Sequence, residues 1–124
     1  MLTKLLKAKL HHAVVTQTDP DYHGSITIDR DLLDATGFLP NEAVLIADCE
    51  NGNRFETYII AGERGSGVIG INGAAALLSK VGNRVIVMSF VYARPAVAMQ
   101  HESKVVICNP QNCAVETIVT RTFP

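Results

Sequence analysis

Asp21-Tyr22-His23-Gly24-Ser25 lies between two strand-like runs, Leu10 to Thr16 and Ile26 to Ile28, and its centre is a Gly-Ser bond. Glycine accepts positive φ angles and serine hydrogen-bonds to its own backbone, so this pattern is typical of a turn between two strands. The same bond allows a second interpretation. A serine hydroxyl beside a flexible glycine can attack the preceding carbonyl if a strained turn and an oxyanion-binding group hold it there. The rest of the chain must decide between a plain turn and a reactive serine.

The length and composition indicate a single domain without an affinity for polyanions. At 124 residues the chain forms one domain, 1–124, and has no room for a second core. Only 19% of its residues are charged and 48% are hydrophobic, a low charge content that suggests cover by other subunits. The net charge of -1 predicts neither a nucleic-acid partner nor an anionic membrane surface.

The sequence shows no targeting signal, no disulfide framework and no metal-ligand spacing. Residues 1–10 interleave lysines with leucines and contain no apolar run long enough for a signal peptide or a membrane span, so we expect a cytoplasmic protein. The three cysteines, Cys49, Cys108 and Cys113, form no disulfide framework. Neither they nor the four histidines have the spacing of metal ligands, so no metal site is expected.

Short strand-like runs with brief helices between them predict a mainly β fold. Asn51-Gly52 is a strong hairpin signal, so residues 43–49 and 54–61 should pair antiparallel. Asp29 can cap a helix that ends at Gly37. Residues 62–73 hold five glycines, a composition typical of a loop. Further helical segments are expected at 74–78 and 96–100, and further strands at 4–16, 26–28, 84–93, 103–108 and 114–121. Such short strands favour a small closed or nearly closed β-barrel, because closure removes exposed sheet edges.

A rival motif, Gly65-Ser66-Gly67-Val68-Ile69-Gly70, matches the Gly-x-Gly-x-x-Gly fingerprint of dinucleotide-binding proteins. That fingerprint requires a helix opening directly on the glycines and an acidic residue about twenty positions later. Here Ile71-Asn72-Gly73 interrupts the expected helix, and residues 84–94 contain no Asp or Glu. The motif therefore does not predict a nucleotide site. Its Gly65-Ser66 bond also shows that the Gly-Ser dipeptide alone identifies nothing.

Polar residues scattered along the chain distinguish position 25 from position 66. Each of them taken singly is better explained as an ordinary surface or strand residue. They are Lys9, His11, Tyr22, Arg54, Thr57, Tyr58 and Asn72. Together they form motifs that resemble the pyruvoyl-dependent aspartate decarboxylases, which make β-alanine. The motifs are Lys9-Leu10-His11, Tyr22-His23-Gly24-Ser25, Asn51-Gly52 with Arg54 and Thr57-Tyr58, Glu63-Arg64-Gly65-Ser66, and Ile71-Asn72-Gly73-Ala74-Ala75-Ala76.

The resemblance runs from the N-terminus to about Phe90 and implies a double-psi β-barrel assembled as a homotetramer. It also implies an inactive proenzyme that cleaves itself between Gly24 and Ser25, giving a β chain of residues 1–24 and an α chain of residues 25–124. The new terminus at Ser25 would be a covalent pyruvoyl group that acts on L-aspartate in place of pyridoxal phosphate. The implied route is pantothenate biosynthesis, and some members of this family need a maturation factor.

The same resemblance assigns roles to individual residues. Those implied in processing are Gly24, Ser25, Thr57 and Asn72, with the Thr57 hydroxyl holding the carbonyl oxygen. Those implied in substrate binding are Lys9, Arg54, Thr57, Gly73, Ala74 and Ala75. Cations suit a dianionic substrate, since arginine offers a bidentate fork and lysine a point charge. The expected catalytic residues are Ser25 and Tyr58, because a neutral phenol can protonate a carbanion. His11 and Tyr22 are expected to support the others.

Two departures and two alternatives accompany this interpretation. His23 stands where the resemblance leads us to expect a carboxylate, and the chain after Phe90 matches the family poorly. We expect His23 to change the rate of cleavage. The alternatives are a small β-barrel binding module, in which Gly24-Ser25 is only a turn, and a homologue that folds but does not cleave. Neither alternative would produce a chain that begins at residue 25.

Overall fold

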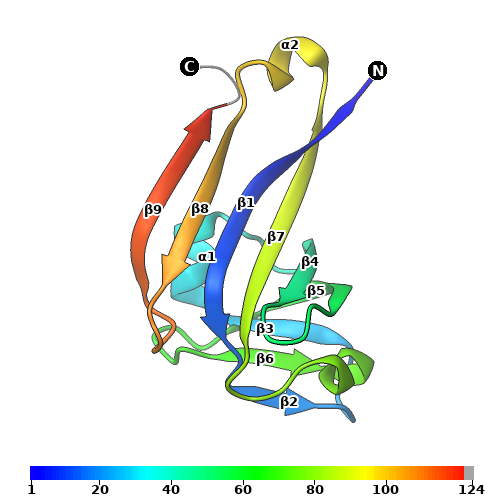
Figure 1. The fold of residues 1–124 in the computed structure, drawn as a ribbon, viewed down its shortest axis with the longest axis vertical. Helices are drawn as coiled ribbons and strands as arrows, with labels where there is room; N and C mark the ends of the chain where they lie inside the picture. The colour runs from blue at the N-terminus through cyan, green and yellow to red at the C-terminus, as the bar shows by residue number, and fades with distance from the viewer. Residues whose placement is uncertain (122–124) are drawn as a thin grey trace.

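The computed structural model describes residues 1–121 and is built almost entirely from short strands (Figure 1). Residues 122–124, the end of the predicted 1–124 domain, lie outside the described part. The strands are β1 (Thr3–Val14), β2 (Gln17–Asp19), β3 (Ser25–Asp29), β4 (Ala43–Asp48), β5 (Arg54–Gly62), β6 (Ile69–Asn72), β7 (Arg84–Ala93), β8 (Glu102–Cys108) and β9 (Ala114–Arg121). The helices are α1 (Arg30–Thr36), the 3-10 helix η1 (Gly73–Leu78) and α2 (Pro95–Ala98). This mainly β architecture is consistent with the small β-barrel predicted from the sequence.

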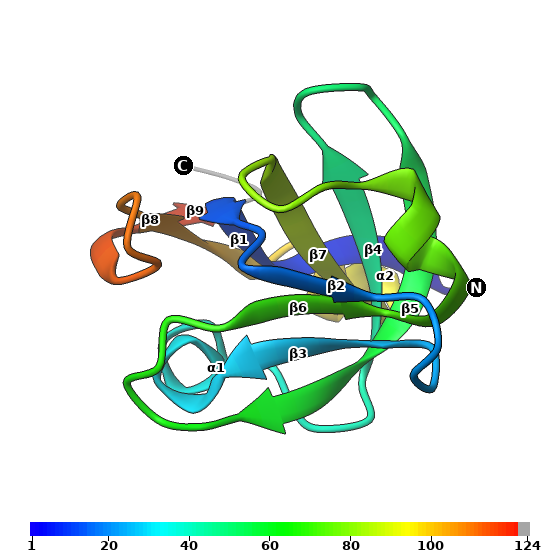
Figure 2. The same ribbon diagram turned by 90° about the horizontal axis from the view of Figure 1, so that it is seen from below.

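The strands form one sheet in the order β2-β6-β3-β5-β4-β7-β1-β8-β9. The long strands β1, β7, β8 and β9 rise together, with α2 at their far end, while β2, β3 and β6 cross below them (Figure 1). Seen from below, these three short strands lie side by side and η1 follows β6 at one edge (Figure 2). The lower strands carry the Gly24-Ser25 bond, because Ser25 is the first residue of β3.

A single apolar core lies between the two parts of the sheet. Along β7 and the middle of β1 its fully buried side chains alternate with less buried ones, as expected for strands that have one face covered, whereas all four residues of β6 are buried. The largest are Leu10, Ile26, Ile28, Leu32, Ile46, Ile59, Ile69, Ile71, Val15, Val44, Val85 and Val87. In contrast, every residue of β9 is exposed, so this strand adds pairing to β8 without adding to the core.

Local signals in the sequence predicted several of these elements. The Asp29 side chain caps α1 by accepting a hydrogen bond from the Asp31 amide, and Gly37 ends the helix at φ 81°. The hairpin around Asn51-Gly52 is also confirmed, with β4 and β5 antiparallel and Gly52 at φ 77°. Helical segments and strands predicted after residue 73 appear within two residues of their expected bounds.

The region 62–73 was wrongly interpreted as loop throughout, because it contains β6. The error arose at Gly70, since glycine weakens a strand and occurs there mainly where another group lies close to the backbone. The Gln17 side chain occupies that space, and a Cβ at Gly70 would lie 2.8 Å from Gln17 Nε2. Strand β2, which carries Gln17, was also missed, because the preceding strand was expected to end at residue 16 and residues 17–19 were assigned to no element. The motif at 65–70 leads into β6, and no helix opens on its glycines.

Candidate active site

Ser25 is fully buried at the start of β3, directly opposite Asn72 on the antiparallel strand β6. The Asn72 Nδ2 donates hydrogen bonds to Ser25 Oγ at 3.0 Å and to Thr27 Oγ1 at 3.2 Å. The Ser25 hydroxyl in turn donates to the backbone oxygen of His23, also at 3.0 Å. A side-chain amide and a backbone carbonyl therefore fix the position of the serine oxygen.

Gly73 presses against the residue that precedes the serine. It has φ 78°, and a Cβ added to it would lie 2.5 Å from Gly24 Cα and 2.8 Å from Gly24 N. A third neighbour is the backbone oxygen of Tyr22, 3.4 Å from the same point. Gly24 itself has nothing within 4 Å of where its own Cβ would be. The Gly24-Ser25 bond thus lies between a tight backbone contact on one side and open space on the other.

A cavity of about 540 Å³ opens beside these residues. Tyr22, Thr27, Ile60 and Asn72 line it together with residues 17–19 of β2. Tyr22 and Asn72 were predicted from the sequence, whereas the other lining residues were not. Thr27 could have been found, because residues two apart on a strand face the same side and Thr27 follows Ser25 at that spacing. Gln17 and Ile60 carry no such signal, since long-range strand pairing alone brings them here.

The second Gly-Ser bond provides a comparison within the same chain. Ser66 is exposed in a turn, where its hydroxyl donates to the backbone oxygen of Glu63 at 2.6 Å and accepts from the Val68 amide. Those are the bonds of an ordinary serine turn. Ser25 differs in burial and in its contact with an amide side chain from another strand, so the two dipeptides occupy unlike environments.

Thr57 and Tyr58 lie on β5, the strand next to β3. The parallel pairing of β3 with β5 begins at Ile26 and Ile59. Ser25 and Tyr58 each lie one residue before this first pair, so they are level with each other. Thr57 faces the barrel and is half-buried, whereas Tyr58 is 38% exposed on the outer face. Within residues 1–121, the Thr57 hydroxyl forms no hydrogen bond with Ser25. The oxyanion role expected of Thr57 therefore stays a prediction.

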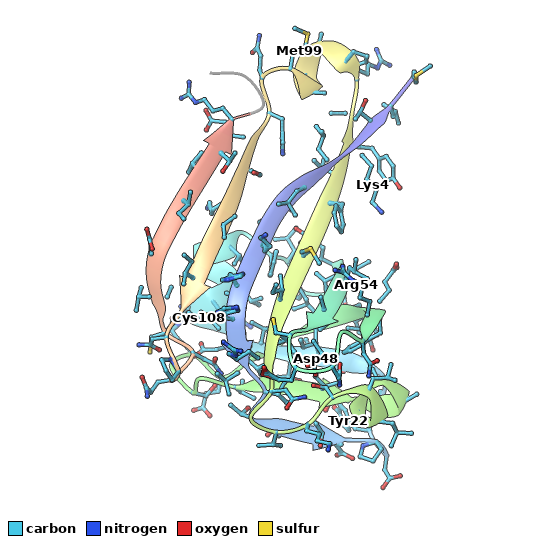
Figure 3. The ribbon with its side chains drawn as sticks, viewed as in Figure 1. Lys4, Tyr22, Asp48, Arg54, Met99 and Cys108 are labelled. Carbon is cyan, nitrogen blue, oxygen red and sulfur yellow. The ribbon has the colours of Figure 1, made fainter. Side chains whose placement is uncertain are left out.

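Lys9 and Arg54 are not brought to the Gly24-Ser25 bond. Three strands, β5, β4 and β7, separate Lys9 on β1 from Ser25 on β3. Arg54 is the first residue of β5. At a rise of about 3.3 Å per residue it lies about 13 Å along this strand from Tyr58, the residue level with Ser25. In Figure 3 Arg54 lies well above Tyr22, which is at the lower end of the molecule. The two predicted substrate-binding cations therefore stand apart from the serine within one chain.

These cations share the outer face of the sheet. Lys9 pairs with Met88, Met88 pairs with Leu45, and Leu45 pairs with Glu56. Residues paired in one row project to the same face, and Arg54 and Tyr58 lie two residues either side of Glu56. Lys9, Arg54 and Tyr58 are therefore all directed away from the core of their own chain.

His11 lies in an irregular part of β1 near Lys9. Its ring stacks on that of His12 at 3.8 Å between centroids, and His12 adopts φ 61° in a bulge of the strand. Burial lowers the pKa of His11, and the positive charges of His12, Lys9 and Arg84 lower it further. His11 is thus a neutral imidazole at pH 7 beside Lys9, distant in the sheet order from Ser25.

Two other kinds of site are absent from the part of the chain that the structure describes. Residues 1–121 contain no group of three or more His, Cys, Asp or Glu side chains arranged to hold a metal ion. No helix among the same residues has the length and apolar character needed to cross a membrane.

Comparisons with known proteins agree on one family. Residues 1–115 match the family model described as aspartate decarboxylase. The chain is 52% identical over 112 residues to aspartate 1-decarboxylase of Bacillus subtilis (strain 168), an alignment that covers 90% of this chain and 88% of the relative. It is 51% identical over 112 residues to the enzyme of the same name from Neisseria meningitidis, with the same coverage of 90% and 88%. A Staphylococcus aureus relative, also named aspartate 1-decarboxylase, is 48% identical over 118 residues, 95% of this chain and 93% of that one.

Proposed function

Since the chain belongs to the aspartate decarboxylase family, we propose that it converts L-aspartate to β-alanine and carbon dioxide and so supplies β-alanine for pantothenate biosynthesis. The observation that carries the proposal, beside this kinship, is the fully buried Ser25 hydroxyl held by Asn72 at 3.0 Å next to Gly24. A plain turn serine needs neither burial nor an amide partner from another strand. The three cysteines are free in the structure, which fits a reducing compartment such as the cytoplasm.

Self-cleavage is the first step of the proposal. Ser25 Oγ attacks the Gly24 carbonyl carbon, the Gly24-Ser25 peptide bond breaks, and the Gly24 acyl group moves from nitrogen to oxygen as an ester. Elimination at residue 25 then breaks the ester, releasing the carboxylate of Gly24 and leaving dehydroalanine at position 25. Hydrolysis with one water molecule releases ammonia and converts residue 25 to pyruvoyl. The products are chains 1–24 and 25–124.

The surroundings of Ser25 fit such a group. Burial shields a reactive carbonyl from bulk water, and the Asn72 amide is the donor nearest to the oxygen of residue 25. The open space beside Gly24 leaves room for the cut ends to separate. When formed, a pyruvoyl group binds the substrate amine covalently and accepts the electron pair released with carbon dioxide. Thr57, half-buried on the neighbouring strand, remains our candidate for holding the Gly24 carbonyl oxygen during cleavage.

Substrate binding requires cations that one chain does not bring to Ser25. Lys9 and Arg54 face outward from the sheet, and in the proposed assembly they would reach the Gly24-Ser25 site of another copy. This arrangement supports the homotetramer implied by the family resemblance, with the bidentate Arg54 and the Lys9 ammonium binding the two substrate carboxylates. Gly73, Ala74 and Ala75 at the start of η1 directly follow the cavity-lining Asn72 and would supply backbone groups to the substrate. His11 beside Lys9 and Tyr22 in the cavity wall support these groups.

Tyr58 is the proposed proton donor to the carbanion, so Tyr58→Phe should separate the two activities of this protein. We expect self-cleavage to proceed normally, because the phenol is 38% exposed and forms no hydrogen bond with Ser25 among the described residues. Decarboxylation should fall by about 10²- to 10⁴-fold, the usual contribution of a positioned general acid. Carbon dioxide release from fully cleaved protein measures the effect. Unchanged turnover in Tyr58→Phe would remove Tyr58 from the mechanism.

Intact-mass spectrometry under denaturing conditions tests the proposed function directly. The purified protein is measured before and after prolonged warm incubation, alone and with lysate of its source organism as a supply of maturation factor. We expect two fragments, residues 1–24 and a chain of residues 25–124 that begins with a carbonyl in place of an amine. A single unbroken chain in every sample, lysate included, would overturn the proposal and favour a binding module or a non-cleaving homologue.

His23 provides a test of what sets the cleavage rate. Its backbone oxygen accepts the Ser25 hydroxyl, while its ring is exposed and meets the Tyr22 ring edge-on at 5.5 Å. A charge beside this hydrogen bond alters the ease with which the hydroxyl loses its proton. We therefore expect the half-time of cleavage to differ between the natural chain and His23→Glu. Equal half-times, measured by intact mass at one pH, would show that residue 23 does not regulate processing.

A further inference from the structure

Asp48 is a buried carboxylate that neither the cleavage chemistry nor substrate binding uses. It is the last residue of β4, is 2% exposed, and accepts hydrogen bonds from Ser79 Oγ at 2.6 Å and Asn83 Nδ2 at 2.9 Å. The backbone amide of Glu50 donates to its other oxygen at 2.8 Å. Within residues 1–121 it forms no ion pair with a lysine or arginine. Neutral donors alone therefore hold this anion, and they come from two separate parts of the chain.

These donors keep the carboxylate charged. Burial raises the pKa of the Asp48 carboxyl, but hydrogen bonds from Ser79 and Asn83 and from the backbone of Glu50 and Asn51 lower it, and the net result is below the ordinary value. An isolated buried charge is costly, so a site that retains one must satisfy it with well-placed donors. Asp48 consequently draws Ser79 and Asn83 firmly toward the turn between β4 and β5.

The same turn also holds the last carbonyl of η1. Leu78 O accepts hydrogen bonds from Asn51 Nδ2 at 3.0 Å and from Asn53 Nδ2 at 2.9 Å. Ser79, the partner of Asp48, is the C-cap residue of this helix. Two adjacent residues at the end of η1 are thus bound to one turn by side chains of that turn. We refer to Asp48, Asn51, Asn53 and Ser79 as the turn anchor.

η1 depends on such an anchor, because little else holds it. It is a 3-10 helix of six residues, and such helices have poorer hydrogen-bond geometry than α-helices. Its first residue has no side-chain N-cap bond. Only Gly73 and Ala76 are buried, whereas Leu77 is 79% exposed. Its hydrophobic packing on the core is therefore confined to two small side chains, Ala76 and, in part, Ala75.

The opposite end of η1 lies at the cleavage bond. Asn72, immediately before the helix, holds Ser25 Oγ, and Gly73, its first residue, touches the backbone of Gly24. At about 2.0 Å per residue the helix spans about 12 Å from Gly73 to the turn anchor. A shift at one end of so short a segment is transmitted to the other. In Figure 3 Asp48 lies above the lower end of the molecule, where Tyr22 is labelled.

We propose that Asp48 is a positioning residue for self-cleavage, acting through Ser79 and η1 to keep Gly73 against Gly24 and Asn72 on Ser25. The inference rests on the proposed function, since it concerns the rate of that cleavage. It assigns to the turn anchor a role in placing the reacting atoms, beyond its contribution to stability. Small misplacements of reacting groups cost up to about 100-fold in rate, so an anchor about 12 Å away can control the reaction.

The test compares cleavage half-times of the natural chain, Ser79→Ala and Asp48→Asn, measured by intact mass well below the melting temperature of each. Asp29→Asn is the matched control, because Asp29 is also a buried carboxylate, 3% exposed, that accepts amide hydrogen bonds from Asp31, Gly65 and Gly67. Asp29 has no hydrogen bond to η1. Ser79→Thr retains the hydroxyl and should restore the natural rate.

We expect Ser79→Ala and Asp48→Asn to cleave about tenfold more slowly or worse, and Asp29→Asn to stay within about twofold of the natural rate at a similar loss of melting temperature. Should Asp48→Asn fail to fold, Ser79→Ala, which removes one hydroxyl, still decides the matter. A Ser79→Ala chain that cleaves as fast as Asp29→Asn overturns this inference while the proposed function stands. A natural chain that never cleaves, even with source lysate, overturns the proposed function and this inference with it.

Discussion

Ser25→Ala will remain a single chain of 124 residues and will release no measurable carbon dioxide from aspartate. Alanine lacks the oxygen that attacks the Gly24 carbonyl, so neither the ester nor the pyruvoyl group can form. No other group in the proposal supplies an electron sink, and the loss should reach the background rate without enzyme. Folding should be nearly unaffected, since the substitution removes one atom and leaves Asn72 bonded to Thr27. Intact mass, carbon dioxide release and melting temperature measure the three expectations.

Ser66→Ala is the control for that experiment. It alters the other Gly-Ser bond of the chain, where the serine is an exposed turn residue bonded to Glu63. We expect it to cleave at Gly24-Ser25 and to decarboxylate aspartate at the natural rate. Residual turnover in Ser25→Ala above that of heat-inactivated protein would place the electron sink elsewhere, and equal defects in both variants would mean that serine loss acts through folding.

The parts of the fold that could be predicted from sequence are those specified by adjacent residues. The Asn51-Gly52 turn and the caps of α1 depend on backbone angles that few residue types adopt, so the residue type reveals the structure. Strands β2 and β6 depend instead on a partner distant in sequence. Gly70 is a poor strand residue by itself, and the reason for it is the Gln17 side chain that lies over it. Nothing near residue 70 in the sequence contains that information.

The candidate site likewise contains residues that could be predicted from the sequence and residues that could not. Ser25, Asn72 and Gly73 were predicted from motifs, and the structure brings them together. The family resemblance assigned Arg54 and Lys9 to substrate binding, and their charge suits that role, yet the described chain holds them apart from Ser25, because residue type does not specify which strands become neighbours. Asp48 was missed, since an aspartate before a turn is ordinary in sequence. Its burial and its bond to Ser79 are visible only in three dimensions.

Gly73→Ala is the second variant with a large expected effect, and it tests the contact that the site depends on. An added Cβ would lie 2.5 Å from Gly24 Cα and 2.8 Å from Gly24 N, so either η1 or the 22–25 segment must move. Movement of either one separates Asn72 from Ser25 or alters the direction of attack on Gly24. We expect the cleavage rate to fall by roughly 100-fold or more, as misplaced reacting groups do. Intact mass over time measures it.

Gly37→Ala separates the contact from the backbone conformation. Gly37 has φ 81°, close to the 78° of Gly73, but nothing lies within 4 Å of its added Cβ. Both variants should lose about 1–2 kcal/mol of unfolding free energy, the cost of a left-handed conformation for a residue with a Cβ. Gly73→Ala should lose more, through the clash, and it alone should lose cleavage. If both variants cleave at the natural rate, the approach of Gly73 to Gly24 is a packing detail. If Gly37→Ala cleaves at the natural rate and Gly73→Ala does not, the tight contact between Gly73 and Gly24 is required for self-cleavage.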